Sequence, residues 1–146
     1  MNRTMPATYE EIAGVAEIAG QLGIEKKHIA TFTETMVRMG TSTNLSAEEA
    51  ATALARLSNI MGTSQGDVDR LGSTVVKMGN NYASTEREIL NMSLRIAGMG
   101  KTLGMAESDV VALSATLSSL GVRAEMGKQI CPLMKKLIRK ISKQYR

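Results

Sequence analysis

Residues 84–121 carry the clearest signal of the fold and read STEREILNMSLRIAGMGKTLGMAESDVVALSATLSSLG. This stretch repeats one apolar spacing, first at Ile89, Met92, Ile96 and Met99, and then at Val110, Leu113, Leu117 and Leu120. This spacing places four side chains on one stripe of an α-helix. A glycine follows each stripe directly, at Gly100 and Gly121. Because glycine accepts the left-handed conformation that often ends a helix, the stretch predicts two amphipathic helices with glycine stops.

The same unit recurs earlier in the chain, with stripes followed by Gly23, Gly40 and Gly79 and, one residue late, by Gly62. A period of about 20 residues indicates an internal repeat. Four pairs have the spacing of a helix-starting capping box: Thr8 with Glu11, Ser46 with Glu49, Ser64 with Asp67, and Thr85 with Glu88. The helix starts near Glu25 and Ala106 lack such a cap. We predict an all-α fold of about six short amphipathic helices joined by short glycine-containing turns, followed by a basic C-terminal helix or tail.

Composition agrees with small-residue helix packing. The 146 residues contain 11 Met but no Trp, and aromatic residues make up 3% of the chain. A Met stripe at Met36, Met39, Met61, Met78 and Met99 is interpreted as core, with an adaptable binding surface as the alternative. The single cysteine, Cys131, excludes an internal disulfide and a multi-cysteine metal site.

The formal net charge of +4 is unevenly distributed. Residues 1–127 hold 11 Lys and Arg against 14 Asp and Glu, whereas residues 128–146 hold 7 Lys and Arg and no acid. The basic character therefore belongs to the end of the chain. We expect a helical domain over 1–127 and a separate basic tail over 128–146, in which Ile130, Met134, Leu137, Ile141 and Tyr145 share one helical face. A solvated terminus, an anionic membrane and nucleic acid are the open interpretations of this tail.

No catalytic, cofactor-binding or metal-binding residue is predicted. The run Gly98 to Thr102 resembles the end of a P-loop, but the first glycine of that motif is replaced by Arg95 and no strand precedes it. His28 lacks metal-ligand partners, so a surface histidine is the simpler interpretation. Cys131 lies near lysines but has no histidine or acid close in sequence, which favours an incidental thiol.

Three stretches then resemble a known family: LSAEEAATALARL at 45–57, GNNYASTEREI at 79–89, and IAGMGKTLGMAESDVVALSATLSSLGVRAE at 96–125. They are similar to the core region of phage tail tape measure proteins, in the minor tail protein family of long-tailed phages and prophages. The resemblance extends from about Tyr9 to Gly127. The segment Gly-Asn-Asn-Tyr-Ala-Ser-Thr-Glu is its most specific part.

The resemblance implies a structural role without catalytic residues. Tape measure proteins occupy the lumen of the tail tube and set its length. The implied partners are the tail tube protein, tail assembly chaperones and tail-tip proteins, and the implied location is the virion tail or the cytoplasm of the bacterial host. We also expect self-association, because Met and Leu stripes would be exposed where partners are missing.

Two features depart from the family pattern. The chain is much shorter than tape measure proteins, and its composition turns basic after Gly127. We therefore expect a truncated, prophage-derived form whose tail was read in a shifted frame. The alternative is an independent helical binding module that uses the basic amphipathic tail on a membrane surface or on nucleic acid.

Overall fold

The computed structural model describes residues 7–144, and this part of the chain is entirely helical apart from turns. Its seven α-helices are α1 (Tyr9–Gln21), α2 (Lys26–Ser42), α3 (Ala47–Met61), α4 (Val68–Asn81), α5 (Glu86–Thr102), α6 (Glu107–Ser119) and α7 (Gly127–Gln144). Two 3-10 helices, Gln65–Asp67 and Ala124–Met126, precede α4 and α7. The predicted all-α class is confirmed.

Capping boxes start three of the helices. Thr8, Ser46 and Thr85 each accept a hydrogen bond from the amide three residues later, and the glutamate there accepts one from the cap amide. These reciprocal bonds satisfy donors that the first helical turn leaves open. The predicted box at Ser64 is wrong for α4, because Ser64 accepts from the amide of Gly66 in the 3-10 turn and α4 begins at Val68.

The predicted glycine stops divide into two groups. Gly23, Gly62 and Gly121 follow helices and have φ values of +84°, +76° and +81°. The stops predicted at Gly40, Gly79 and Gly100 are wrong, because α2, α4 and α5 continue through them.

Close packing explains the glycines inside helices. A Cβ on Gly40 would lie 2.8 Å from the backbone nitrogen of Ala47, and one on Gly100 would lie 2.5 Å from Cγ2 of Val110. A Cβ on Gly79 would overlap the side chain of Glu86. Each of these glycines therefore lets its helix approach the beginning of the next helix more closely than any larger residue would.

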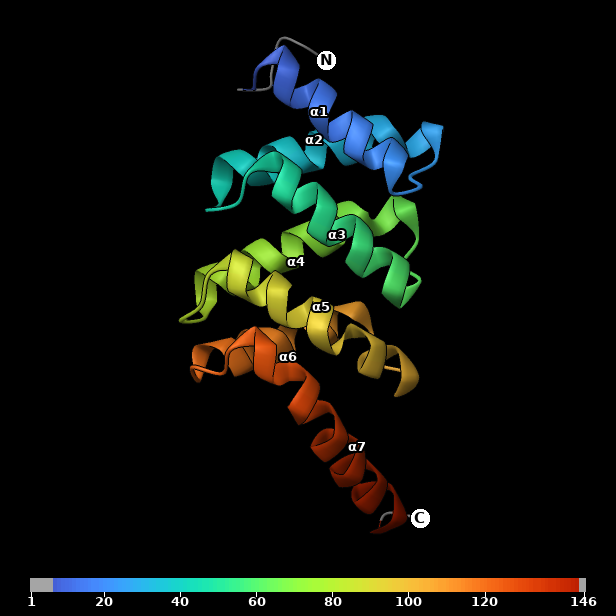
Figure 1. Cartoon of the computed structure of the whole chain (residues 1–146), viewed down its shortest axis with the longest axis vertical. Helices are drawn as coiled ribbons and strands as arrows, with labels where there is room; N and C mark the ends of the chain where they lie inside the picture. Colours follow the sequence, from blue (N-terminus) through green and yellow to red (C-terminus); the bar gives the residue numbers. More distant parts are fainter. Residues whose placement is uncertain (1–6, 145–146) are drawn as a thin grey trace.

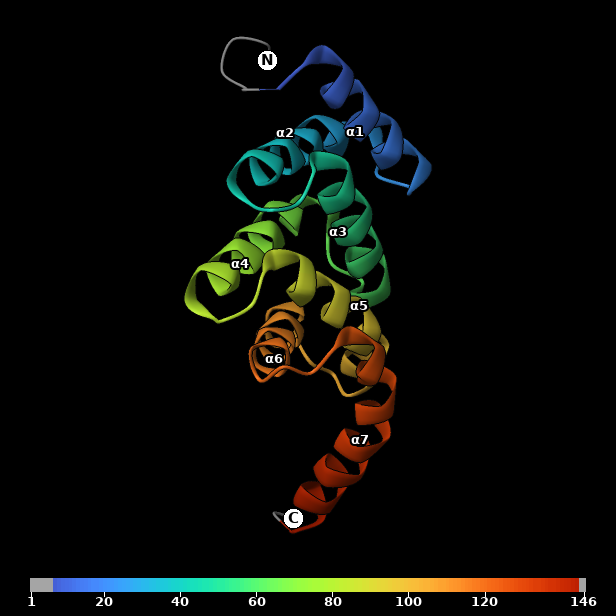
Figure 2. The same ribbon diagram turned by 60° about the vertical axis from the view of Figure 1, so that its left-hand side comes forward.

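The helices form two layers stacked along one long axis. One layer contains α1, α3, α5 and α7, and the other contains α2, α4 and α6, with each helix packed on the next of its own layer or on its sequence neighbour (Figures 1 and 2). The caps of α1, α3 and α5 are Thr8, Ser46 and Thr85, which recur at nearly equal intervals along the chain. The structural unit is thus a pair of helices, as in α-solenoids.

The core lies between the two layers and runs the length of the stack. Its largest fully buried side chains are Met36, Leu54, Leu57, Ile89, Leu90, Met92 and Ile96. Of the Met stripe, Met36, Met39 and Met99 are buried, and Met61 and Met78 pack against the core at its edge. The interpretation of the stripe as core is confirmed.

Helix α7 begins as a continuation of the first layer. Gly127 is buried against α5, where an added Cβ would lie 2.9 Å from Cβ of Arg95. Cys131 and Met134 also pack against the core. Pro132 lies inside α7 between these two residues. Beyond Met134 the helix extends past the rest of the molecule (Figure 1).

Candidate interaction surfaces

The projecting part of α7 exposes an apolar row. Leu133, Leu137 and Ile141 are 66%, 53% and 47% exposed, although each is an aliphatic residue. Large exposed aliphatic side chains in one row are typical of a contact surface. Helix α7 is continuous from Gly127 to Gln144, so the predicted residues Ile130, Met134, Leu137 and Ile141 do share one face. Met134 contacts the core, whereas Leu137 and Ile141 are exposed, and Tyr145 is outside the described residues.

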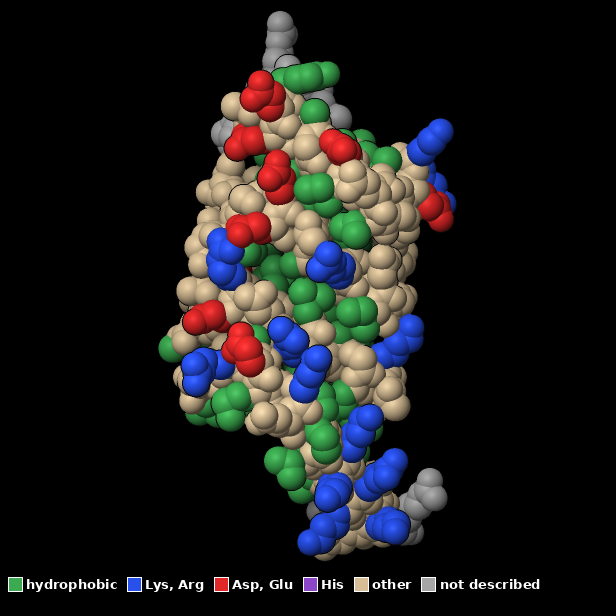
Figure 3. All heavy atoms as spheres, in the orientation of Figure 1, with side chains coloured by type: hydrophobic (Ala, Val, Ile, Leu, Met, Phe, Trp, Pro, Cys, Tyr) green, Lys and Arg blue, Asp and Glu red, His purple; other side chains and the backbone are tan. Residues whose placement is uncertain are grey.

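Cations surround this row. Helix α7 carries six Lys and Arg and no acid, namely Lys128, Lys135, Lys136, Arg139, Lys140 and Lys143. The space-filling view shows them gathered at the C-terminal end of the molecule (Figure 3). With no acid on the same helix, this end has a positive potential that is unbalanced locally.

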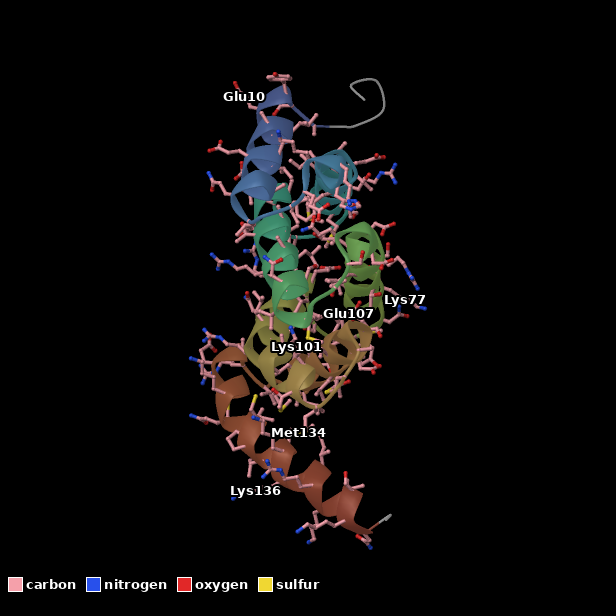
Figure 4. All side chains as sticks on the ribbon, turned by 90° about the vertical axis from the view of Figure 1, so that its right-hand side faces the viewer. Glu10, Lys77, Lys101, Glu107, Met134 and Lys136 are labelled. Atoms are coloured by element: carbon pink, nitrogen blue, oxygen red, sulfur yellow. The ribbon has the colours of Figure 1, made fainter. Side chains whose placement is uncertain are left out.

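The opposite end of the stack is acidic. Helix α1 contains Glu10, Glu11 and Glu17 and no Lys or Arg. Glu11 is used by the capping box, and Glu17 accepts a hydrogen bond from the side chain of Gln21 at 3.0 Å. Acidic side chains gather at this end, and Glu10 and Lys136 lie at opposite ends of the molecule (Figures 3 and 4). Capping and the helix dipole explain why single acids occur in α1. These local roles do not predict that the acids of α1 and the cations of α7 lie at opposite ends of the molecule.

The candidate reactive groups do not come together. Lys101 lies exposed in the last turn of α5, so the run from Gly98 to Thr102 is helical and not a phosphate-binding loop. His28 lies half-buried in the first turn of α2, and Cys131 lies half-buried on α7. Within residues 7–144, no cluster of three His, Cys, Asp or Glu side chains is placed to hold a metal ion.

One ion pair joins neighbouring helices of the first layer. Arg87 of α5 donates to both carboxylate oxygens of Glu49 in α3, and its Nη2 also donates to the carbonyl oxygen of Asn44 at 3.0 Å. The hydrogen bond from Arg87, with a further one from the amide of Ser46, lowers the pKa of Glu49 to about 2. Both effects stabilise the charged carboxylate, so this contact fixes the start of α3 against the start of α5.

A shallow hollow of about 630 Å³ lies between α3, α5 and the 3-10 turn before α7. Its polar lining is formed by Arg56, Asn59, Asn91, Arg95 and Glu125. This lining combines cations and amides with one acid but contains no serine, cysteine or histidine. It offers hydrogen bonds to a partner and no nucleophile paired with a base.

These features define a class: a stacked all-α protein whose distinctive surfaces are its two oppositely charged ends. The chain belongs to the family of phage-related minor tail proteins, whose family model matches residues 1–145. It is accordingly a structural component of a phage tail. The match continues through the basic segment, beyond Gly127, where the resemblance was expected to end. That residues 128–146 come from a shifted reading frame stays a prediction.

No curated protein and no solved structure matches the chain significantly. In the described part of the chain, no helix combines the length and the apolar character needed to cross a bilayer.

Proposed function

We propose that the chain acts as a tape measure element, which lies in the lumen of a phage tail tube and contributes to tail length. Membership of the minor tail protein family supports a location in the phage tail. The observation that carries the finer role is the arrangement of helix pairs along a single axis, with the N-terminus and C-terminus at opposite ends (Figure 1). In such a stack the axial length grows with each added pair, which is the property that a measuring protein needs.

The unit of measurement follows from the capping boxes. Residues 46–84 run from the cap of α3 to the residue before the cap of α5 and form one complete helix pair. Added as a packed pair, this unit lengthens the stack by about 8–10 Å, the usual distance between packed helices. Added as one continuous straight helix, the same segment extends about 58 Å at ~1.5 Å per residue.

Duplicating residues 46–84 in the phage that encodes the chain tests this role. Tail lengths are measured by electron microscopy of many particles, and averaging over the particles resolves both increments. The larger increment indicates that the helices open into an extended form inside the tube, and the smaller increment indicates that they stay stacked. Particles with normal tails and unchanged length contradict the measuring role.

A matched control separates length from folding. Replacing Gly98 with alanine changes a helical position where an added Cβ meets no atom within 4 Å, so the fold and the tail length are expected to stay unchanged. The proposed partners are the tail tube protein, tail assembly chaperones and tail-tip proteins. Co-purification of the tagged chain with these proteins from infected or induced cells supports the proposal. Absence of the chain from purified tails counts against the proposal.

A further inference from the structure

The two ends of the molecule carry complementary surfaces that face away from each other. The acidic helix α1 and the basic helix α7 belong to the same layer but lie at opposite ends of the stack (Figures 2 and 4). They cannot meet within one molecule. Any pairing between them must therefore join two molecules.

On α7, an apolar row lies beside a cationic row. At about 100° per residue, Leu133, Leu137 and Ile141 fall on one side of the helix, and Lys136, Lys140 and Lys143 fall about 60–120° away. The apolar row is exposed, as are the three lysines. Met134 lies at the edge of this apolar row, about 60° from Leu137, and packs against the core.

Helix α1 shows the matching arrangement with small residues and acids. Val15 and Ala19 face the core, whereas Tyr9, Ala13 and Gly20 form an exposed row about 120° away. Glu10 and Glu17 lie beside that row, opposite the core, and are also exposed. Ala13 and Gly20 are small, so they leave room for larger side chains of a partner helix.

The charged rows also have the same spacing. Glu10 and Glu17 are seven residues apart, as are Lys136 and Lys143, and seven residues correspond to about 10.5 Å along a helix. Viewed from the N-terminus, the acidic row of α1 lies clockwise of its apolar row, whereas the lysine row of α7 lies anticlockwise of its apolar row. When two parallel helices face each other, these arrangements bring the acids against the lysines. The same alignment places Leu137 between Tyr9 and Ala13.

The two views define how a second molecule would lie. In Figure 1 helices α1, α3, α5 and α7 all run towards the lower right, but Figure 2 shows α7 turned away from the direction that α1, α3 and α5 share. A second molecule whose α1 lies parallel to α7 is therefore turned relative to the first molecule.

We propose that α7 of one molecule docks on α1 of a second copy of this chain, so that copies associate head to tail. The occupant is a second copy because the lysine row of α7 has a row of opposite charge, at the same seven-residue spacing, within the chain itself. The contact is heterologous, so association continues beyond a dimer into open chains. This inference does not depend on the tape measure role.

The contact joins essentially one helix to one helix, so it belongs with the smaller interfaces and is expected to be weak. Its charge pairs lie at the surface and are screened within ~10 Å at 0.1 M salt. Association is therefore expected to grow with protein concentration and to decrease as salt is raised. Sedimentation velocity of the full chain over a concentration series, at low and high salt, measures both effects.

Charge reversal tests the pairing. The double variant Lys136→Glu with Lys143→Glu, and separately Glu10→Lys with Glu17→Lys, are each expected to weaken association about tenfold or more. A chain carrying all four changes exchanges the charges of the two faces and is expected to recover association. The matched control is Arg56→Glu with Lys77→Glu, which makes the same change in net charge at exposed positions of α3 and α4, in the middle of the stack. Circular dichroism confirms that all variants stay helical.

Three results would overturn the proposal. One is a closed dimer that is indifferent to these reversals, and the second is a fourfold variant that associates no better than either double variant. The third is a monomeric chain whose α7 binds vesicles of anionic lipid or duplex DNA and loses that binding with Lys136→Glu and Lys143→Glu. Vesicle binding would assign the apolar row to a membrane, whereas DNA binding would leave the apolar row unused.

Discussion

Arg87 and Glu49 form a two-pronged contact between α5 and α3, with Nη2 of Arg87 2.8 Å from Oε2 of Glu49. Glu49 is at the same time the acidic member of the capping box of α3. One carboxylate therefore serves both the start of its own helix and the packing of two helices in the first layer. This shared use links local helix initiation to the stacking of helix pairs.

Replacing Arg87 with lysine is expected to lower the thermal unfolding midpoint by a small amount. An ammonium group cannot donate in parallel to both carboxylate oxygens and to the carbonyl oxygen of Asn44. Thermal denaturation followed by circular dichroism measures the change. The control is Arg70→Lys, since Arg70 lies 3.7 Å from Asp67 in an exposed pair and little change is expected there. Equal losses in both variants would show that the fork geometry is unimportant.

Acid is expected to remove part of the stability through Glu49. Its pKa is about 2 in the folded chain, against an ordinary value of 4.5. A lowered folded pKa stabilises the fold above pH 4.5, and this contribution is lost as the pH falls from 4.5 towards 2. The pKa of Glu88 is also lowered, mainly by its hydrogen bond from the amide of Thr85, and acts in the same direction.

Urea unfolding at pH 7, 4 and 3 measures this dependence. The variant Glu49→Gln is expected to be less stable than the parent at pH 7 and to lose less stability on acidification. Parallel curves for the two proteins would contradict the assignment of the effect to Glu49.

Gly100→Ala is expected to destabilise the fold by about 1–3 kcal/mol, the usual cost of overpacking a core. Its new Cβ would lie 2.5 Å from Cγ2 of Val110, so either the Val110 side chain or the packing of α5 on α6 must shift. Gly98→Ala is the control in the same helix, with nothing within 4 Å of the new Cβ. That variant is expected to gain about 0.5–1 kcal/mol from helix propensity. Urea denaturation distinguishes the two, and a gain in both would show that Gly100 is not needed for packing.

Ala106→Ser is expected to stabilise the chain by about 1 kcal/mol. Ala106 caps α6 without a side-chain hydrogen bond, at φ −70° and ψ 155°, which closely matches Ser46 at −73° and 158°. The amide of Asp109 donates to the carbonyl oxygen of Ala106 at 3.1 Å, and the hydroxyl introduced by Ala106→Ser would accept from the same amide. The reverse change, Ser46→Ala, should lose a comparable amount in the same urea titration. A loss at Ser46 without a gain at Ala106 would show that the amide of Asp109 is not available to the new cap.

Local structure could be predicted from the sequence where it depends on residues within one helical turn. Capping pairs such as Thr8 with Glu11 and Thr85 with Glu88 mark real helix starts, and the predicted lack of a cap at Glu25 and Ala106 is confirmed. These features depend on residues within one helical turn, so they are visible without knowledge of the fold. The all-α class and the Met-rich core follow from the same short-range periodicity.

The role of the internal glycines and the positions of the charged ends depend on how the helices pack. The local pattern predicts helix stops at Gly40, Gly79 and Gly100, but these glycines permit contact with the helix that follows. The opposition of acidic α1 to basic α7 arises from the stacking of pairs, which brings helices two apart in sequence into one layer. Whether a glycine ends a helix or admits a neighbour depends on atoms beyond its own helix, and no local pattern contains them.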